Sequence, residues 1–393
     1  MKRLLLCLAL ALAPAAFAAA PSFGDLTVNG TNSVSVLITG SDPSLDALAR
    51  RAFGSHGRYY VAAPGEGYRY ELRFNPAGPG QVRVDILPRF GSPLASEVAS
   101  APTTREALLK AADLAVERTN GKGLRGFFSS KLVFIGERTG HKEVYTSDLF
   151  FGSVRQITHD RAIAMSPRWS PDGGRILYTS YYRSGFPDIF LIDLDGYQRT
   201  VFESFKGTNS GARFNENGTQ VAMVLSGEGQ TEIYVADGQG HRVSRRTHSD
   251  TAKASPCFSP DGSRIVFAME PGPQLYVIPA AGGYPRRVSP SGFSRYCAEP
   301  DWSRANPDKI AFTMQGGGYQ IAVLSLSSGT AQQVSRAPFD GIEPSWLPDG
   351  RHLVYTARDR TTSALCILDT ETGKSTAISR GFGPAFQASV WSR

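Results

Sequence analysis

The sequence Ser-Pro-Arg-Trp-Ser-Pro-Asp-Gly at residues 166–173 decides the fold, because the chain repeats it. It returns as Ser-Pro-Cys-Phe-Ser-Pro-Asp-Gly at 255–262 and as Glu-Pro-Ser-Trp-Leu-Pro-Asp-Gly at 343–350. Weaker copies stand at 211–218 and 299–303. A phrase repeated at a fixed interval indicates stacked copies of one supersecondary unit.

Each unit contains an aromatic anchor, and the anchors are Trp169, Phe214, Phe258, Trp302, Trp346 and Trp391. Successive anchors are 44 or 45 residues apart. An aromatic side chain at the same place in every unit is expected to pack one unit on the next, so we predict a structural role for all six. The Pro-Asp-Gly aspartates are predicted to form turns, because these three residue types favour turn geometry.

After each anchor the chain reads as three further strands, and four antiparallel strands in this interval are typical of a propeller blade. The two ends of the array are incomplete. Before Trp169 stand three strands without an anchor strand, near residues 131–136, 143–149 and 153–158. After the last full unit, residues 385–391 form an anchor strand alone. The two fragments complete one shared blade, so we predict six blades closed by the C-terminal strand.

The first residues predict a targeting segment. Lys2 and Arg3 are basic, residues 4–16 are apolar, and Ala16 and Ala18 place small residues three and one before a cut. We therefore predict a signal peptide over residues 1–18 and an exported mature protein. No later apolar run approaches the roughly eighteen residues that span a bilayer, so the mature chain is expected to be peripheral to membranes and not inserted.

Residues 22–122 predict a small α+β domain. Asp42 before Pro43 reads as a helix N-cap, and Thr103 with Glu106 forms a capping box before a second helix. Alternating strands lie between the two helices. The predicted fold is therefore an α+β N-terminal domain followed by an all-β six-bladed propeller over residues 127–393.

Removal of the signal peptide leaves Cys257, Cys297 and Cys366. Export permits disulfides, but an odd number leaves one thiol unpaired. Cys257 and Cys297 are offset by four strand positions relative to their anchors, which is about 13 Å, whereas a disulfide needs about 6 Å between Cα atoms. Three buried thiols are therefore expected.

Catalytic and cofactor motifs are not found. The six histidines contain no His-x-x-x-His pair, and no Cys-x-x-Cys, Gly-x-Ser-x-Gly or Walker motif occurs. We predict no catalytic residue, no metal and no cofactor. The formal net charge of +7 is spread over scattered residues without an aromatic platform, so no nucleic acid partner is predicted. An enzyme assembled from propeller loops stays open as an alternative.

A propeller gathers the loops that precede its inner strands at one mouth of its central funnel. Here those loops contain residues 162–165, 208–211, 251–255, 295–299 and 339–343. They mix small, polar and apolar side chains, as adaptable protein-binding surfaces do. This composition favours a protein partner.

With a signal peptide, an α+β domain and six such blades in order, the chain resembles the TolB family of the periplasmic Tol-Pal system. The segment Gly-Leu-Arg-Gly-Phe-Phe-Ser-Ser-Lys-Leu-Val-Phe at 123–134 looks like that family's junction into its propeller. Residues 165–173 are similar to its first full anchor, and Val-Trp-Ser at 390–392 resembles its closing strand. The resemblance covers the chain from Gly123 onward.

The resemblance implies a monomeric, non-enzymatic periplasmic scaffold that binds the lipoprotein Pal and supports outer-membrane integrity and cell division. The Pal-facing residues that it implies are Met165, Thr208, Asn209, Ser210, Gly211, Ser255, Ala298, Glu299, Pro300 and Glu343. In the family the start of the mature protein contacts TolA. Residues 21–28 depart from that pattern, which leaves TolA or another inner-membrane Tol protein as the second partner. The rival interpretation is an exported propeller that binds, or hydrolyses, oligosaccharides or peptides.

Overall fold

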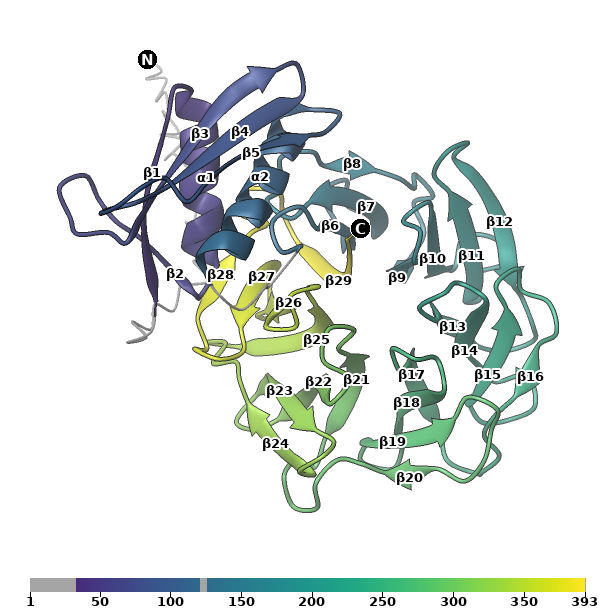
Figure 1. Cartoon of the computed structure of the whole chain (residues 1–393). Coiled ribbons are helices and arrows are strands. Elements are labelled where there is room, and N and C mark those ends of the chain that lie inside the picture. Colours follow the sequence, from purple (N-terminus) through teal and green to yellow (C-terminus); the bar gives the residue numbers. More distant parts are fainter. Residues whose placement is uncertain (1–32, 121–125, 393) are drawn as a thin grey trace, which may run out of the picture.

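The structure, a computed structural model, describes residues 33–120 and 126–392 (Figure 1). An N-terminal α+β domain precedes a six-bladed propeller, which confirms the predicted fold class. The predicted signal peptide lies outside the described residues, and the domain boundaries at 22–122 and 127–393 stay predictions.

The α+β domain is a five-stranded sheet, ordered β2-β1-β3-β4-β5, with two helices. Its elements are β1 (Val34–Gly40), α1 (Pro43–Ser55), β2 (Tyr59–Val61), β3 (Tyr70–Gly78), β4 (Gln81–Pro88), β5 (Ala95–Ser100) and α2 (Thr104–Thr119). The Asp42 carboxylate accepts the Ser44 N–H at the start of α1, and the Thr103 hydroxyl accepts the Glu106 N–H at the start of α2. Both predicted caps are therefore present. The short parallel strand β2 was not predicted, because three residues carry no readable alternation.

Each propeller blade is a four-stranded antiparallel sheet. Blades 1 and 2 consist of β9 (Ala164–Trp169), β10 (Arg175–Ser180), β11 (Asp188–Asp193), β12 (Gln198–Glu203), β13 (Asn209–Phe214), β14 (Gln220–Leu225), β15 (Glu232–Asp237) and β16 (Ser244–Arg245). Blades 3 and 4 consist of β17 (Lys253–Phe258), β18 (Arg264–Met269), β19 (Gln274–Pro279), β20 (Arg286–Arg287), β21 (Cys297–Trp302), β22 (Lys309–Gln315), β23 (Tyr319–Ser325) and β24 (Thr330–Gln333). Blade 5 consists of β25 (Asp340–Trp346), β26 (His352–Arg358), β27 (Ser363–Asp369) and β28 (Ser375–Ala377).

Blade 6 is built from both ends of the propeller sequence. It combines β6 (Lys131–Gly136), β7 (Glu143–Asp148) and β8 (Arg155–Gln156) with β29 (Ala385–Trp391). Figure 1 shows the yellow C-terminal strand β29 beside the blue strand β6, with which it pairs. The predicted closure is confirmed. As a result, the innermost strand of every blade is paired with a neighbouring strand of the same sheet.

The aromatic anchors pack at the seams between blades. Trp169, Phe214, Phe258, Trp302 and Trp346 each belong to a hydrophobic cluster shared with the preceding blade. In blade 6, strand register places Val390 at the equivalent position, opposite Leu132. Trp391 therefore lies one residue beyond the expected register, where its ring packs 6.1 Å from that of Trp169 and its Nε1–H donates to the Pro171 oxygen.

The seam between blades 5 and 6 has no cluster of its own, because it is continuous with the core of the α+β domain. That single cluster joins Phe53 and Leu108 of the domain to Ile367 of blade 5 and Phe134 of blade 6. The domain is thus docked on these two blades through a shared core.

Cysteine side chains take part in this packing and not in cross-links. Cys257, Cys297 and Cys366 are all buried, and none forms a disulfide with another described residue. Cys257 and Cys297 lie in the cluster between blades 3 and 4, as expected for buried thiols.

The Pro-Asp-Gly turns supply a matched pair of substitutions that measures how tightly the ring closes. Gly173 and Gly262 have left-handed φ values of 71° and 70° in equivalent turns. A Cβ at Gly173 would overlap the Trp391 ring, whereas at Gly262 the nearest neighbour is Asn215 Nδ2 at 3.8 Å. Gly262→Ala should cost about 1–2 kcal/mol for the left-handed backbone alone. Gly173→Ala should cost more, seen as a larger drop in Tm by calorimetry. Equal drops would show that Trp391 does not hold the closed ring.

Candidate functional site

The predicted partner residues cluster where the inner strands bulge. Each inner strand shifts register against its neighbour at one place. At each bulge one residue has positive φ, and these six, here called the bulge ring, are Ser166, Gly211, Ser255, Glu299, Glu343 and Gln387. Four of them, Gly211, Ser255, Glu299 and Glu343, belong to the predicted set. The repeat thus brings together residues that are far apart in sequence, one from each blade.

Long side chains in the bulge ring bind the backbone of the next blade. Glu299 Oε2 accepts the Glu343 N–H at 3.1 Å, Glu343 Oε2 accepts the Gln387 N–H at 3.2 Å, and Gln387 Oε1 accepts the Ser166 N–H at 2.8 Å. Thr313 and Thr356 hydroxyls also donate to the two carboxylates. These hydrogen bonds therefore link blade 4 to 5, blade 5 to 6 and blade 6 to 1. The side chains at Ser166, Gly211 and Ser255 are too short to reach the backbone of the next blade.

The two carboxylates of the bulge ring affect one another. Burial, together with the negative charge of Glu343, raises the pKa of Glu299 to about 7. The channel space around them, lined also by Arg168 and Pro300, is only about 70 Å³. Small-molecule sites usually enclose about 300–1,000 Å³, so this mouth is closed by polar contacts and offers no room for a sugar ring.

Several of the predicted partner residues are buried in the interior and are not exposed to a partner. Asn209, Ala298 and Pro300 are buried. The Asn209 side chain accepts the Phe205 N–H at 2.9 Å and donates to the Pro187 oxygen at 3.1 Å. Met165, Thr208 and Ser210 are half-buried. Asn209 therefore joins the loop before β13 to the β10–β11 loop of blade 1.

Those two loops carry exposed apolar side chains that sequence reasoning missed. Tyr182, Phe186 and Phe205 are 50%, 68% and 49% exposed, and Ile163 beside them is 48% exposed. The Tyr181 N–H donates to the Ile163 oxygen at 3.0 Å. This hydrogen bond joins the β10–β11 loop to the segment before β9. We call these four residues the aromatic rim. The rim lies on the loop face of the propeller, where the inner strands begin.

One layer deeper in the channel, an ion pair crosses the propeller. Arg213 of blade 2 donates to Asp301 of blade 4 at 2.7 Å between Nη1 and Oδ1. The other Asp301 oxygen accepts the Trp346 N–H of blade 5 at 2.7 Å. One carboxylate thus ties three blades together and closes the middle of the channel.

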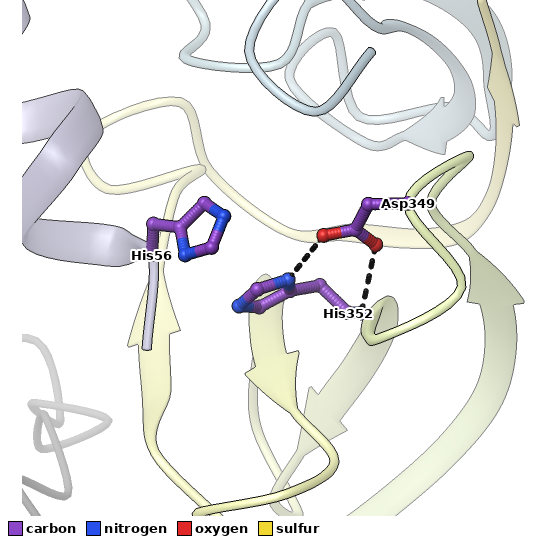
Figure 2. A group of neighbouring side chains, drawn as sticks. All are labelled: His56, Asp349 and His352. Atoms are coloured by element: carbon purple, nitrogen blue, oxygen red, sulfur yellow. Dashed lines mark hydrogen bonds and ion pairs between the residues drawn. The ribbon is translucent and has the colours of Figure 1, made fainter. Parts of the chain in front are cut away.

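A second polar group joins the α+β domain to the propeller. His56 follows α1, Asp349 lies in the Pro-Asp-Gly turn of blade 5, and His352 follows that turn (Figure 2). All three are buried, and His352 Nδ1 lies 2.6 Å from Asp349 Oδ2. His352 Nε2 accepts the Gly57 N–H at 3.1 Å. This hydrogen bond runs from the domain to the propeller.

The same three side chains are the one group in residues 33–120 and 126–392 with metal-ligand spacing. The hydrogen bonds argue against a metal there. Because His352 Nε2 accepts from Gly57, its proton sits on Nδ1 and is donated to Asp349, so neither ring nitrogen has a free lone pair. The arrangement fits a hydrogen-bonded junction between the α+β domain and blade 5. We call His56, Asp349 and His352 the lock.

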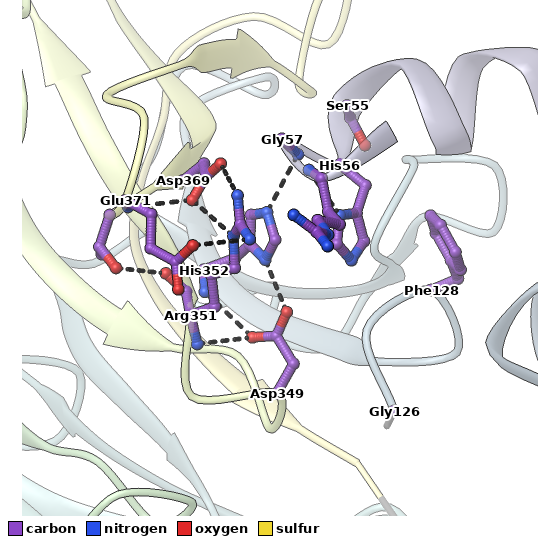
Figure 3. Close-up of polar contacts among 12 residues, drawn as sticks. Ser55, His56, Gly57, Gly126, Phe128, Asp349, Arg351, His352, Asp369 and Glu371 are labelled. Carbon is purple, nitrogen blue, oxygen red and sulfur yellow. Dashed lines mark hydrogen bonds and ion pairs between the residues drawn. The ribbon is translucent and has the colours of Figure 1, made fainter. Parts of the chain in front are cut away.

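Further charged groups support the lock (Figure 3). Arg351 donates to both oxygens of Asp369, at 2.9 and 2.6 Å, and to Glu371 at 2.8 Å. Asp349 Oδ1 accepts the Arg351 N–H at 3.0 Å. The His56 ring lies edge to face with that of His352, with the centroids 4.3 Å apart. Its buried Nε2 has no hydrogen-bond partner among the described residues.

Sequence reasoning missed the lock because nothing local links His56 to His352. Three residues of the bulge ring, in contrast, form a pattern that is visible in the sequence. Glu299, Glu343 and Gln387 recur every 44 residues, three positions before Trp302, Trp346 and Val390. A long polar side chain repeated there could have indicated interblade bonding.

Comparison with known proteins gives consistent matches. Residues 119–393 match the family model described as the TolB beta propeller domain. A protein named "Protein TolB homolog" from Chlorobium luteolum is 35% identical over 167 residues, which is 42% of this chain and 37% of that protein. "Tol-Pal system protein TolB" from Desulfosudis oleivorans is 38% identical over 127 residues, which is 32% of this chain and 28% of that protein. The chain thus matches only about a third of the length of these curated relatives.

Among solved structures, the crystal structure of TolB from Acinetobacter baumannii superposes with a TM-score of 0.79 at 22% sequence identity. The match covers 91% of this chain and 96% of that one. The likeness therefore extends over both the α+β domain and the propeller.

The raised pKa of Glu299 gives a pH-dependent expectation for Glu299→Gln. The folded state binds a proton that the unfolded state releases between pH 4.5 and about 7, so wild-type stability falls as pH rises through that window. Gln removes the charge and keeps the acceptor for Thr313 and Glu343. The variant should have a higher Tm than wild type at pH 8, with a smaller difference at pH 5. Glu228→Gln, at an exposed position, is the control; a uniform shift at both pH values would contradict the assignment.

Burial lowers the pKa of His56 well below 6.5, so the unfolded state binds a proton that the folded state does not. Its contribution is fully present above pH 6.5 and is lost as pH falls, by about 1.4 kcal/mol per pH unit. His56→Phe keeps a ring against Phe127 and Phe128 and should flatten the decline in unfolding free energy between pH 6.5 and 5. The exposed His241→Gln should not change this slope. An unchanged slope in His56→Phe would refute the role of His56.

Proposed function

The chain belongs to the TolB β-propeller family, and from this premise we propose that it is a non-enzymatic periplasmic scaffold of the Tol-Pal system. It binds the lipoprotein Pal through the propeller and connects Pal to the inner-membrane Tol proteins. Through that link it supports outer-membrane integrity and cell division. The observation that carries the proposal is the aromatic rim beside a closed, polar channel mouth.

The rim has the composition of a protein-binding surface. Aromatic residues are enriched at protein interfaces and supply much of their binding energy. The adjoining mouth holds about 70 Å³, which favours a macromolecule lying across the face over a small ligand held within it. Of the Pal-facing set, Thr208, Asn209 and Ser210 lie nearest in sequence to Phe205. The interface therefore centres on blades 1 and 2.

The α+β domain provides the second end of the link. In this proposal TolA, or another inner-membrane Tol protein, binds at the start of the mature chain. The shared core and the His352 lock hold the domain on blades 5 and 6, so both partners act on one rigid body. No described helix is long and apolar enough to cross a membrane. We propose a monomer that bridges membrane-attached partners.

The rival function, an oligosaccharide- or peptide-binding exported propeller with possible hydrolytic activity, needs an open polar groove on the loop face. The stitched bulge ring favours the scaffold instead. Turnover of a glycan or peptide by the purified chain would decide for the rival.

Calorimetry of the mature chain with Pal of the same organism tests the interface. Phe186→Ser and Phe205→Ser should each weaken binding by about tenfold or more, as loss of a central aromatic contact does. Tyr284→Ser is a matched control, because Tyr284 is 98% exposed in the β19–β20 loop on the opposite face. Equal affinities for all variants would move the interface elsewhere, and no binding by wild type would refute Pal as the partner.

Glu299 is a poor site for that test. Its carboxylate binds Thr313 and the Glu343 backbone inside the channel, so a charge reversal there would disturb the seam between blades 4 and 5 as well as the mouth.

A further inference from the structure

The propeller contains a larger cavity at the opposite end of its channel, on the turn face where the inner strands end. Its volume is about 340 Å³, within the range of small-ligand sites. Apolar walls come from the anchors, including Trp169, Trp302 and Trp346. The residues one position before each anchor, counted from Val390 in blade 6, form its polar ring: Arg168, Arg213, Cys257, Asp301, Ser345 and Ser389.

The charges of this cavity do not cancel. Arg213 is paired with Asp301, and Arg304 at the rim is paired with Glu216 at 2.8 Å. Arg168 forms no ion pair with any described residue, and its guanidinium makes one hydrogen bond, from Nη1 to the Pro167 oxygen at 3.2 Å. A guanidinium has five N–H donors, so most of those on Arg168 are available to a ligand. Burial and the neighbouring Arg213 lower the pKa of Arg168 to about 10, which still leaves it charged at neutral pH.

Hydroxyl groups extend this donor surface. Ser345, Ser389 and Arg168 occupy equivalent positions in the consecutive blades 5, 6 and 1. Ser345 Oγ accepts the Val390 N–H at 3.3 Å, so its own proton is free to be donated into the cavity. Three donors thus line one arc of the ring, and the single carboxylate of the ring, Asp301, is held by Arg213 and Trp346 on the other side.

We propose that this cavity is a binding site for a small organic anion, whose carboxylate is held by Arg168 and the two serines. Its apolar or planar body packs against the tryptophans. A charged hydrogen-bonding pair contributes more than a neutral one in a partly buried site, so Arg168 is the recognising group. The site lies on the face opposite the aromatic rim, and the proposal does not depend on Pal binding.

Benzoate is a suitable probe, because it combines a carboxylate with a planar apolar body. Calorimetry of the mature chain should show binding of benzoate, no binding of the uncharged benzyl alcohol, and weaker binding of inorganic phosphate, which lacks the apolar part. Arg168→Gln should weaken benzoate binding by about tenfold or more, and Ser389→Ala should weaken it by a smaller factor. Arg304→Gln is the matched control, since that arginine stands at the same rim but is paired and half-exposed.

Thermal stability gives an independent readout that also checks folding. Without benzoate, Arg168→Gln should melt at or above the wild-type Tm, because it removes a partly buried cation that no described carboxylate pairs with. Benzoate should raise the Tm of wild type and Arg304→Gln but not that of Arg168→Gln. An equal rise in all three proteins, or no binding of benzoate to wild type at millimolar concentration, would overturn the proposal.

Discussion

Pairing of β29 with β6 is the interaction on which the rest of the structure depends. It joins the last propeller strand to the first and turns a linear array into a closed ring. The same strand, β29, supplies Ala385, Ala388 and Val390 to the hydrophobic cluster under the α+β domain. Ring closure and domain docking therefore use one set of buried contacts, and the domain covers the seam at which the ring is joined.

Inside the ring, the repeat creates six equivalent positions that need not hold equivalent residues. The backbone fixes a left-handed residue and a bulge in each inner strand, because the strands must bend around the axis. Glu299, Glu343 and Gln387 use that geometry to bind the next blade. Blades 1 and 2 instead place the charged side chains of Arg168 and Arg213 in the channel. The Arg213 guanidinium forms an ion pair with Asp301 of blade 4. The inner surface is thus asymmetric although the fold is nearly symmetric.

This division separates three surfaces. The loop face carries exposed aromatic side chains over a closed mouth, the turn face contains the cavity with Arg168, and blades 5 and 6 carry the α+β domain. The hydrogen bond from Gly57 to His352 and the buried pair Arg351–Asp369 lie beneath that domain. The shared hydrophobic cluster and the hydrogen bond from Gly57 to His352 join the domain to the propeller.

The sequence by itself determined the blades, their number and the closing strand, because these follow from a local pattern repeated at a fixed interval. It also determined both helix caps, since each cap depends on residues only two or three apart. Tertiary structure alone decided that Val390 takes the anchor position while Trp391 packs on blade 1, because register is set by pairing with β6. It also decided that Asn209 and Ala298 are buried and that Phe186 and Phe205 are exposed. The lock between His56 and His352 and the pair Arg213–Asp301 join residues remote in sequence, and only the closed ring and the docked domain bring them within bonding distance.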